Sequence, residues 1–98
     1  MKTDYEFLKT EIDGHILTVT INRPDRMNAL HPPAHAEFDE VWNEFDKDEN
    51  LWVGIVTGEG DRAFSAGNDL KFQAEAGGKM DVDIASSGFA GLTSRFNL

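Results

Sequence analysis

The chain contains no cysteine, which excludes disulfides, thiolate catalysis and cysteine-ligated zinc sites. Basic residues are also few, 9 against 18 acidic ones, and the formal net charge of −9 disfavours nucleic acid as a partner. No apolar run approaches the roughly 20 residues that cross a bilayer, and the N-terminus lacks the apolar centre of a signal peptide. We therefore expect a cytoplasmic protein with no nucleic acid and no membrane as partner.

The rest of the composition is that of one small globular domain. The chain has 98 residues, of which 40% are hydrophobic and 28% are charged. We expect residues 1–98 to form a single domain. Gly77-Gly78 interrupts the pattern that precedes it and predicts a mobile loop over residues 77–83.

The N-terminal part has the pattern of a β-hairpin. Two strand-like runs over residues 5–12 and 15–22 flank Asp13-Gly14, a pair typical of tight turns between strands. In the second run apolar and polar residues alternate, so we expect one buried face and one polar face. Arg23-Pro24 should end this strand.

A helix and a further strand are predicted after the hairpin. Apolar residues recur at helical spacing over residues 34–46, and Pro32-Pro33 suits the first helical turn. Residues 51–56 are apolar throughout, as in a strand that is covered on both faces. This order predicts an α/β fold with a right-handed crossover connection. Two more helices are expected, one running toward Ala76 and one carrying Phe89, Leu92 and Phe96.

The segment from Ala63 to Lys71 is the best candidate for chemistry, since it follows the apolar strand and is expected to open a helix. Backbone N–H groups at such a turn face outward without partners and favour an anion. The small residues Ser65, Ala66 and Gly67 allow a ligand to approach the main chain closely. Asn68-Asp69 is suited to cap the helix. Ser65 lacks the surroundings of a nucleophile, so we interpret it as a packing residue.

Three other motifs are better explained by structure than by ligand binding. Gly58-Glu59-Gly60 lacks the third glycine of a dinucleotide fingerprint and predicts a surface turn. The run 46–50 lacks the later residues of a calcium loop and predicts an acidic helix end. His31 and His35 have the spacing of a metal pair but no evident third ligand, so we expect one histidine at the helix start, one at the surface, and no metal.

Three segments, 19–30, 53–58 and 63–71, resemble in order and spacing the N-terminal part of the crotonase superfamily, the enoyl-CoA hydratase/isomerase family. The resemblance implies a fold of ββα spiral units, here an incomplete one with an N-terminal hairpin, a crossover helix and a buried strand. It also implies the shared chemistry of that superfamily, which is stabilisation of an enolate formed from an acyl-CoA or enoyl-CoA thioester.

The resemblance also implies roles for individual residues. The backbone N–H of Asn68 corresponds to one of two oxyanion-hole donors. Coenzyme A enters as part of the substrate, with no tightly bound cofactor, and full-length members are usually homotrimers or hexamers. The residues that correspond to CoA contacts are Arg26, Met27, Ala29, Ala66, Gly67, Asp69 and Leu70.

The second oxyanion donor and the catalytic carboxylates of the family correspond to positions beyond Leu98. We therefore expect an N-terminal half-site of an acyl-CoA enzyme, a lyase or isomerase by family, that is inactive as an isolated chain. The alternative is a non-catalytic CoA-binding or oligomerisation module, or a truncated homologue.

Overall fold

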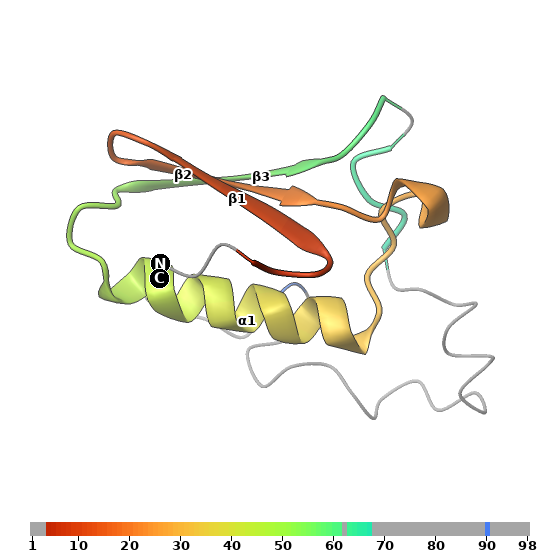
Figure 1. Ribbon diagram of the computed structural model, residues 1–98, viewed down its shortest axis with the longest axis horizontal. Helices are drawn as coiled ribbons and strands as arrows, with labels where there is room; N and C mark the ends of the chain where they lie inside the picture. The colour runs from red at the N-terminus through yellow and green to blue at the C-terminus, as the bar shows by residue number, and fades with distance from the viewer. Residues whose placement is uncertain (1–3, 62, 68–89, 91–98) are drawn as a thin grey trace.

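The computed structural model describes residues 4–61, 63–67 and 90, and Figure 1 shows a three-stranded sheet lying over one helix. None of the described helices is long and apolar enough to cross a membrane. The predicted loop over 77–83 and the two predicted C-terminal helices lie outside the described residues. The elements in chain order are β1 (Leu8–Asp13), β2 (Ile16–Ile21), the 3-10 helix η1 (Pro24–Arg26), α1 (Pro32–Lys47) and β3 (Val53–Gly58).

The predicted hairpin is confirmed, with its turn one residue later than expected. β1 and β2 pair antiparallel from Leu8 opposite Ile21 to Asp13 opposite Ile16, which leaves a two-residue loop. Gly14 is the first loop residue and has a φ of 60°. A positive φ at that position matches the right-handed twist of the flanking strands, and glycine adopts it without a steric penalty.

The predicted helix and third strand are also confirmed. β3 pairs parallel with β2, from Ile16 opposite Val53 to Ile21 opposite Gly58, and the strand order is β1-β2-β3. Parallel neighbours cannot be joined by a tight turn, so α1 carries the chain back across the sheet. Pro32 and Pro33 occupy the first turn of α1, where a missing backbone N–H has no consequence for the helix.

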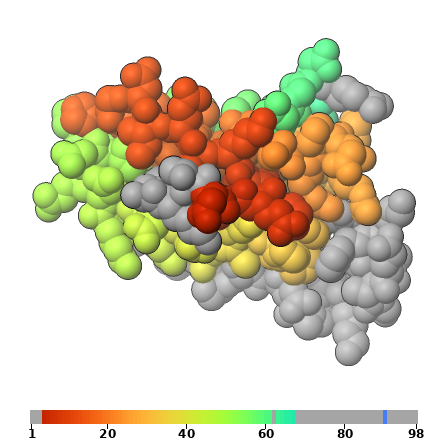
Figure 2. Space-filling view, viewed as in Figure 1, coloured from red at the N-terminus to blue at the C-terminus, as the bar shows by residue number. Residues whose placement is uncertain are grey.

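The core lies between α1 and the sheet face that carries Leu17, Val19 and Ile21. Phe38, Val41 and Trp42 enter it from α1, all at most 2% exposed. The space-filling view in Figure 2 shows the hairpin side lying against α1. Glu37 of α1 connects the helix to the segment that leads into β1. Its carboxylate oxygens accept the N–H groups of Glu6 and Phe7 at 3.0 and 2.8 Å.

The expected burial of β3 on both faces is wrong for the residues that the structure describes. Gly54 faces α1, where a Cβ would lie 3.0 Å from Trp42 Cζ3. The opposite face carries Val53 and Ile55, which are 49% and 44% exposed, beside Ile16 at 38%. The described helix covers only one face of the sheet, so an apolar run in the sequence did not mean burial on both sides.

Tyr5, the only tyrosine of the chain, should titrate near pH 12 in the folded protein. Desolvation by burial raises its pKa to about 12, aided by the negative charges of Glu40, Glu44, Glu37 and Asp4. An unfolded phenol ionises near pH 10, so the folded state holds the proton over a range in which the unfolded state loses it. The contribution of protonated Tyr5 to folding stability is thus fully present below about pH 10 and falls as the pH rises from about 10 to about 12.

A near-ultraviolet tyrosinate titration checks this expectation, with far-UV circular dichroism to confirm that the protein is folded. The midpoint should return to about 10 in denaturant, and Tyr5→Phe should remove the signal. A folded-state midpoint near the denatured value would contradict the expected effect of burial.

Candidate functional site

The turn after β2 is held by its own hydrogen bonds. The carbonyl of Arg23 accepts the N–H groups of Arg26 and Asn28 at 2.9 and 2.8 Å, which closes the turn around η1. Met27 and Asn28 both have a φ of 55°, in the left-handed region. The Arg23 guanidinium is buried and donates from Nη1 to the carbonyl of Ala29 at 2.6 Å. The Arg23 side chain thus stabilises the turn by this hydrogen bond.

This turn lies against the described part of the 63–71 segment. The N–H of Ala66 donates to the carbonyl of Met27 at 3.0 Å, and the N–H of Leu30 donates to the carbonyl of Gly67 at 2.7 Å. Gly67 has a φ of 91°, which a side chain would disfavour. Two motifs separated by α1 and β3 are therefore brought together at one end of the sheet.

Asn28 connects the turn after β2 to the 63–67 segment at a junction that the sequence did not reveal. It was not among the predicted site residues. Its side chain is 1% exposed and accepts the N–H of Arg23 at 3.0 Å through Oδ1. Its Nδ2 donates to the carbonyls of Glu59 at 3.0 Å and Ala63 at 2.8 Å. The sequence offers only a weak signal for this role of Asn28. Asparagine is enriched at left-handed backbone positions, but the chain has several asparagines and this preference does not single out one of them.

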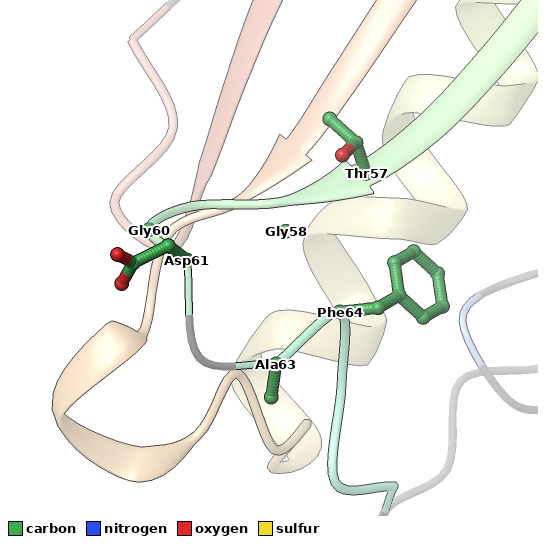
Figure 3. Close-up of a pocket in the computed structure, with 6 residues that line it drawn as sticks. All are labelled: Thr57, Gly58, Gly60, Asp61, Ala63 and Phe64. Atoms are coloured by element: carbon green, nitrogen blue, oxygen red, sulfur yellow. The ribbon is translucent and has the colours of Figure 1, made fainter.

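A hollow of about 320 Å³ lies beside this junction, where β3 ends. In α/β proteins ligands bind at the carboxyl ends of parallel strands, so its position suits a binding site. Figure 3 shows the exposed ring of Phe64 and the carboxylate of Asp61 on different sides of it. The predicted CoA contacts that the structure describes do not line the hollow. The described residues that line it are Thr57, Gly58, Gly60, Asp61, Ala63 and Phe64.

The predicted CoA contacts in the turn differ in how much surface they offer. Met27 is 37% exposed and Arg26 is half-buried, so both can reach a ligand. Ala29 is 7% exposed and its carbonyl accepts the Arg23 guanidinium, which leaves it little free surface. The binding role of these residues stays a prediction.

In the second segment, Ala66 is exposed and Gly67 is half-buried. We expected outward-facing N–H groups without partners here, and for these two residues that expectation is wrong. The N–H of Ala66 donates to Met27, and the N–H of Gly67 donates to the Ser65 hydroxyl at 3.1 Å. The Ser65 hydroxyl thus stabilises the local turn. Asn68, Asp69 and Leu70, the other predicted site residues, lie outside the described part of the chain.

The expectation of a surface histidine is also wrong, since His31 and His35 are 6% and 1% exposed. His35 precedes Phe38 by three residues and so shares the buried face of α1. Its Nδ1 accepts the N–H of Ala90 at 2.9 Å, while Trp42 Nε1 donates to the Ala90 carbonyl at 3.0 Å. Within residues 4–61, 63–67 and 90, no group of three or more potential ligands is placed to hold a metal ion.

The hairpin, the crossover helix and the parallel third strand define an α/β unit of the crotonase fold. The sequence model of the enoyl-CoA hydratase/isomerase family matches residues 11–96, and the chain belongs to that family. Carnitinyl-CoA dehydratase of Escherichia coli K12 is 45% identical over 93 residues, which are 95% of this chain and 35% of that protein. The corresponding protein of Citrobacter koseri is 46% identical over 85 residues, 87% of this chain and 32% of its own.

Solved structures agree with the fold. The crystal structure of carnitinyl-CoA hydratase from Mycobacterium avium aligns with a TM-score of 0.79 at 30% identity, over 93% of this chain and 35% of that chain. The structure of a Mycobacterium paratuberculosis protein, EchA1_1, aligns with a TM-score of 0.76 at 32% identity, over 90% of this chain and 34% of its own. The chain spans about a third of the length of the curated relatives it matches.

Proposed function

We propose that residues 1–98 supply the N-terminal half of an acyl-CoA site, in an enzyme that adds water to an enoyl-CoA thioester or removes it. The observation that carries this proposal is the pairing of Met27 and Leu30 with Ala66 and Gly67. It joins two of the three segments on which the family resemblance rests. The names of two relatives, a dehydratase and a hydratase of carnitinyl-CoA, favour water chemistry over a double-bond shift.

In this proposal the backbone N–H of Asn68 is a donor to the thioester oxygen. Removing a proton next to the thioester carbonyl makes an enolate, in which negative charge gathers on that oxygen. A preorganised N–H stabilises this charge more than it stabilises the neutral substrate, so it lowers the barrier. A donor of this type typically contributes about 100-fold to 1,000-fold in rate.

The turn supplies the proposed contacts to coenzyme A. Arg26 would meet a phosphate as a charged, bidentate donor. Met27, which is 37% exposed, would offer apolar surface to the rest of the ligand. Ala66 and Gly67 are small enough for the ligand to approach the main chain. The net charge of −9 opposes an anionic ligand only weakly, since screening limits its reach to about 10 Å at moderate salt.

Titration of the purified 98-residue chain with coenzyme A, followed by backbone amide NMR, tests the proposed site. We expect shifts to concentrate at residues 26–30 and 63–67. Arg26→Ala should weaken binding by about 10-fold, as expected for a lost charge-assisted hydrogen bond. Lys47→Ala, which removes a positive charge from the exposed end of α1, is the matched control and should change the affinity less than about 2-fold.

Equal effects of the two substitutions would contradict a specific role of Arg26, and the absence of any NMR shift would contradict the proposed site.

The same purified chain should not hydrate crotonyl-CoA, because one donor without positioned acid and base groups leaves most of the barrier in place. Robust loss of the conjugated thioester absorbance would overturn the proposed half-site.

A second function, a module that binds CoA or associates with other chains without catalysis, is favoured by one observation. Ile16, Val53 and Ile55 form an exposed apolar group on the outer face of the sheet. Sedimentation at increasing concentration would show self-association if this face is the functional one. A monomer that binds CoA would favour the enzymatic half-site.

We also propose a cytoplasmic location for the protein, in keeping with the absence of cysteine.

A further inference from the structure

Asn28 bridges the two sides of the candidate site, and we propose that it is the positioning residue that fixes their spacing. For its effect on a ligand, this inference rests on the proposed function. Asn28 contacts no ligand in this proposal. It acts through the backbone of residues on either side of it.

The hydrogen-bonding groups of Asn28 match their surroundings in number and kind. A carboxamide offers a carbonyl oxygen that accepts and an NH₂ group with two donors. Here the oxygen accepts the N–H of Arg23, and the nitrogen donates to the carbonyls of Glu59 and Ala63. Asn28 thus ties the chain just after β2 to the chain just after β3, across 31 and 35 residues of sequence. An aspartate would bring a carboxylate, which donates nothing, against two carbonyl oxygens.

The backbone at Asn28 is held in an unfavourable conformation that its side chain helps to maintain. Met27 and Asn28 are consecutive non-glycine residues with a φ of 55°. A left-handed conformation is unfavourable for residues other than glycine, less so for asparagine, and it persists where the surrounding contacts over-determine it. The three side-chain hydrogen bonds of Asn28 are contacts of that kind. They hold the turn that directs the carbonyl of Met27 toward Ala66.

The spacing that Asn28 holds is the spacing between the proposed CoA contacts. Met27 lies directly before it and pairs with Ala66, while Leu30 lies two residues after it and pairs with Gly67. In the part of the chain that the structure describes, these are the two backbone hydrogen bonds between the turn and the 63–67 segment. Without the Asn28 amide, we expect this short pairing to open more often while the sheet stays intact.

The unmodified chain provides the first test. Both side-chain NH₂ protons of Asn28 are buried and bonded, so they should exchange with solvent at least about 10-fold more slowly than those of the exposed Asn50. Equal exchange rates for the two side-chain amides would overturn the proposal.

Asn28→Gly provides the second test, since glycine accepts the left-handed backbone and removes the side chain with its amide. Backbone amide exchange at Ala66 and Leu30 should become about 10-fold faster, and the Kd for coenzyme A should rise about 10-fold. Exchange at Val19 in β2 should not change. Asn50→Gly is the matched control, because it makes the same substitution at an exposed turn and should leave all four values unaltered.

The outcomes separate this inference from the proposed function. Unchanged exchange at Ala66 and Leu30 in Asn28→Gly would overturn the positioning role, whatever the chain binds. If the unmodified chain binds no coenzyme A, the proposed function fails, while the exchange data still decide whether Asn28 holds the two segments together. A general loss of structure, seen as faster exchange at Val19 too, would leave the decision to the side-chain amide measurement on the unmodified chain.

Discussion

Replacing Phe38 with alanine should lower the free energy of unfolding by about 3–5 kcal/mol. Phe38 is 0% exposed and lies in the middle of α1, stacked near Trp42 with ring centroids 6.3 Å apart. The substitution removes most of the apolar surface that this side chain buries and leaves a cavity that its neighbours fill only in part. Chains of this length typically have a total stability of about 5–15 kcal/mol, so the variant should lose a large share of it.

Urea unfolding followed by circular dichroism measures this effect. Phe64→Ala is the matched control, because the same atoms are removed from a side chain that is 58% exposed, and it should change stability by less than about 0.5 kcal/mol. Phe38→Leu, which keeps most of the volume, should lose only about 1.5 kcal/mol and stay measurable. A loss from Phe38→Ala no larger than that from Phe64→Ala would contradict the position of α1 over the sheet.

Gly58→Ala should destabilise the chain by about 3 kcal/mol, the upper end of the usual range for overpacking. A Cβ at this position would lie 2.3 Å from the carbonyl oxygen of Phe64 and 2.8 Å from that of Ala63. It would also lie 2.7 Å from Nδ2 of Asn28. Two of these neighbours are backbone atoms, so relief requires the 63–67 segment to move away from the sheet. The hydrogen bond from Asn28 to Ala63 should be lost with it, and coenzyme A binding should weaken.

Gly14→Ala separates this steric effect from a general intolerance of glycine replacement. Gly14 has a φ of 60°, yet a Cβ there would meet nothing within 4 Å. Its replacement should cost only the backbone strain, about 1–2 kcal/mol. Urea midpoints of the two variants give the comparison. If Gly58→Ala were the milder of the two, the close approach of the 63–67 segment to β3 would be wrong.

The sequence predicted the elements whose signal is local. Alternation of apolar and polar residues indicated β2, and the Asp13-Gly14 pair indicated the hairpin that joins β2 to β1. Spacing over three to four residues indicated α1 with its buried stripe. Gly14 acts at the hairpin turn through its own backbone conformation, so a few neighbouring residues were enough to predict the turn. The family resemblance singled out the turn after β2 and the 63–71 segment, and the structure places their described parts side by side.

Long-range contacts explain where the sequence predictions failed. Residues 51–56 are apolar, but whether both faces of β3 are covered depends on which elements lie there, and Val53 and Ile55 are exposed. His35 is polar, but its place on the core side of α1 buries it against the backbone of Ala90, 55 residues away in sequence. A composition or a period contains no information about such partners.

The sequence by itself determined the strands, the helix, the hairpin turn and the family, because each of these depends on short-range periodicity or on motifs of a few residues. Only the tertiary structure decided how the candidate site is built. It gave the N–H of Ala66 to Met27, left Gly58 no room for a side chain, and made Asn28 the connection between two chain segments. The hydrogen bonds from Ala66 to Met27 and from Asn28 to Ala63 join residues more than 30 positions apart. They exist only once α1 and β3 have brought the two segments to the same end of the sheet.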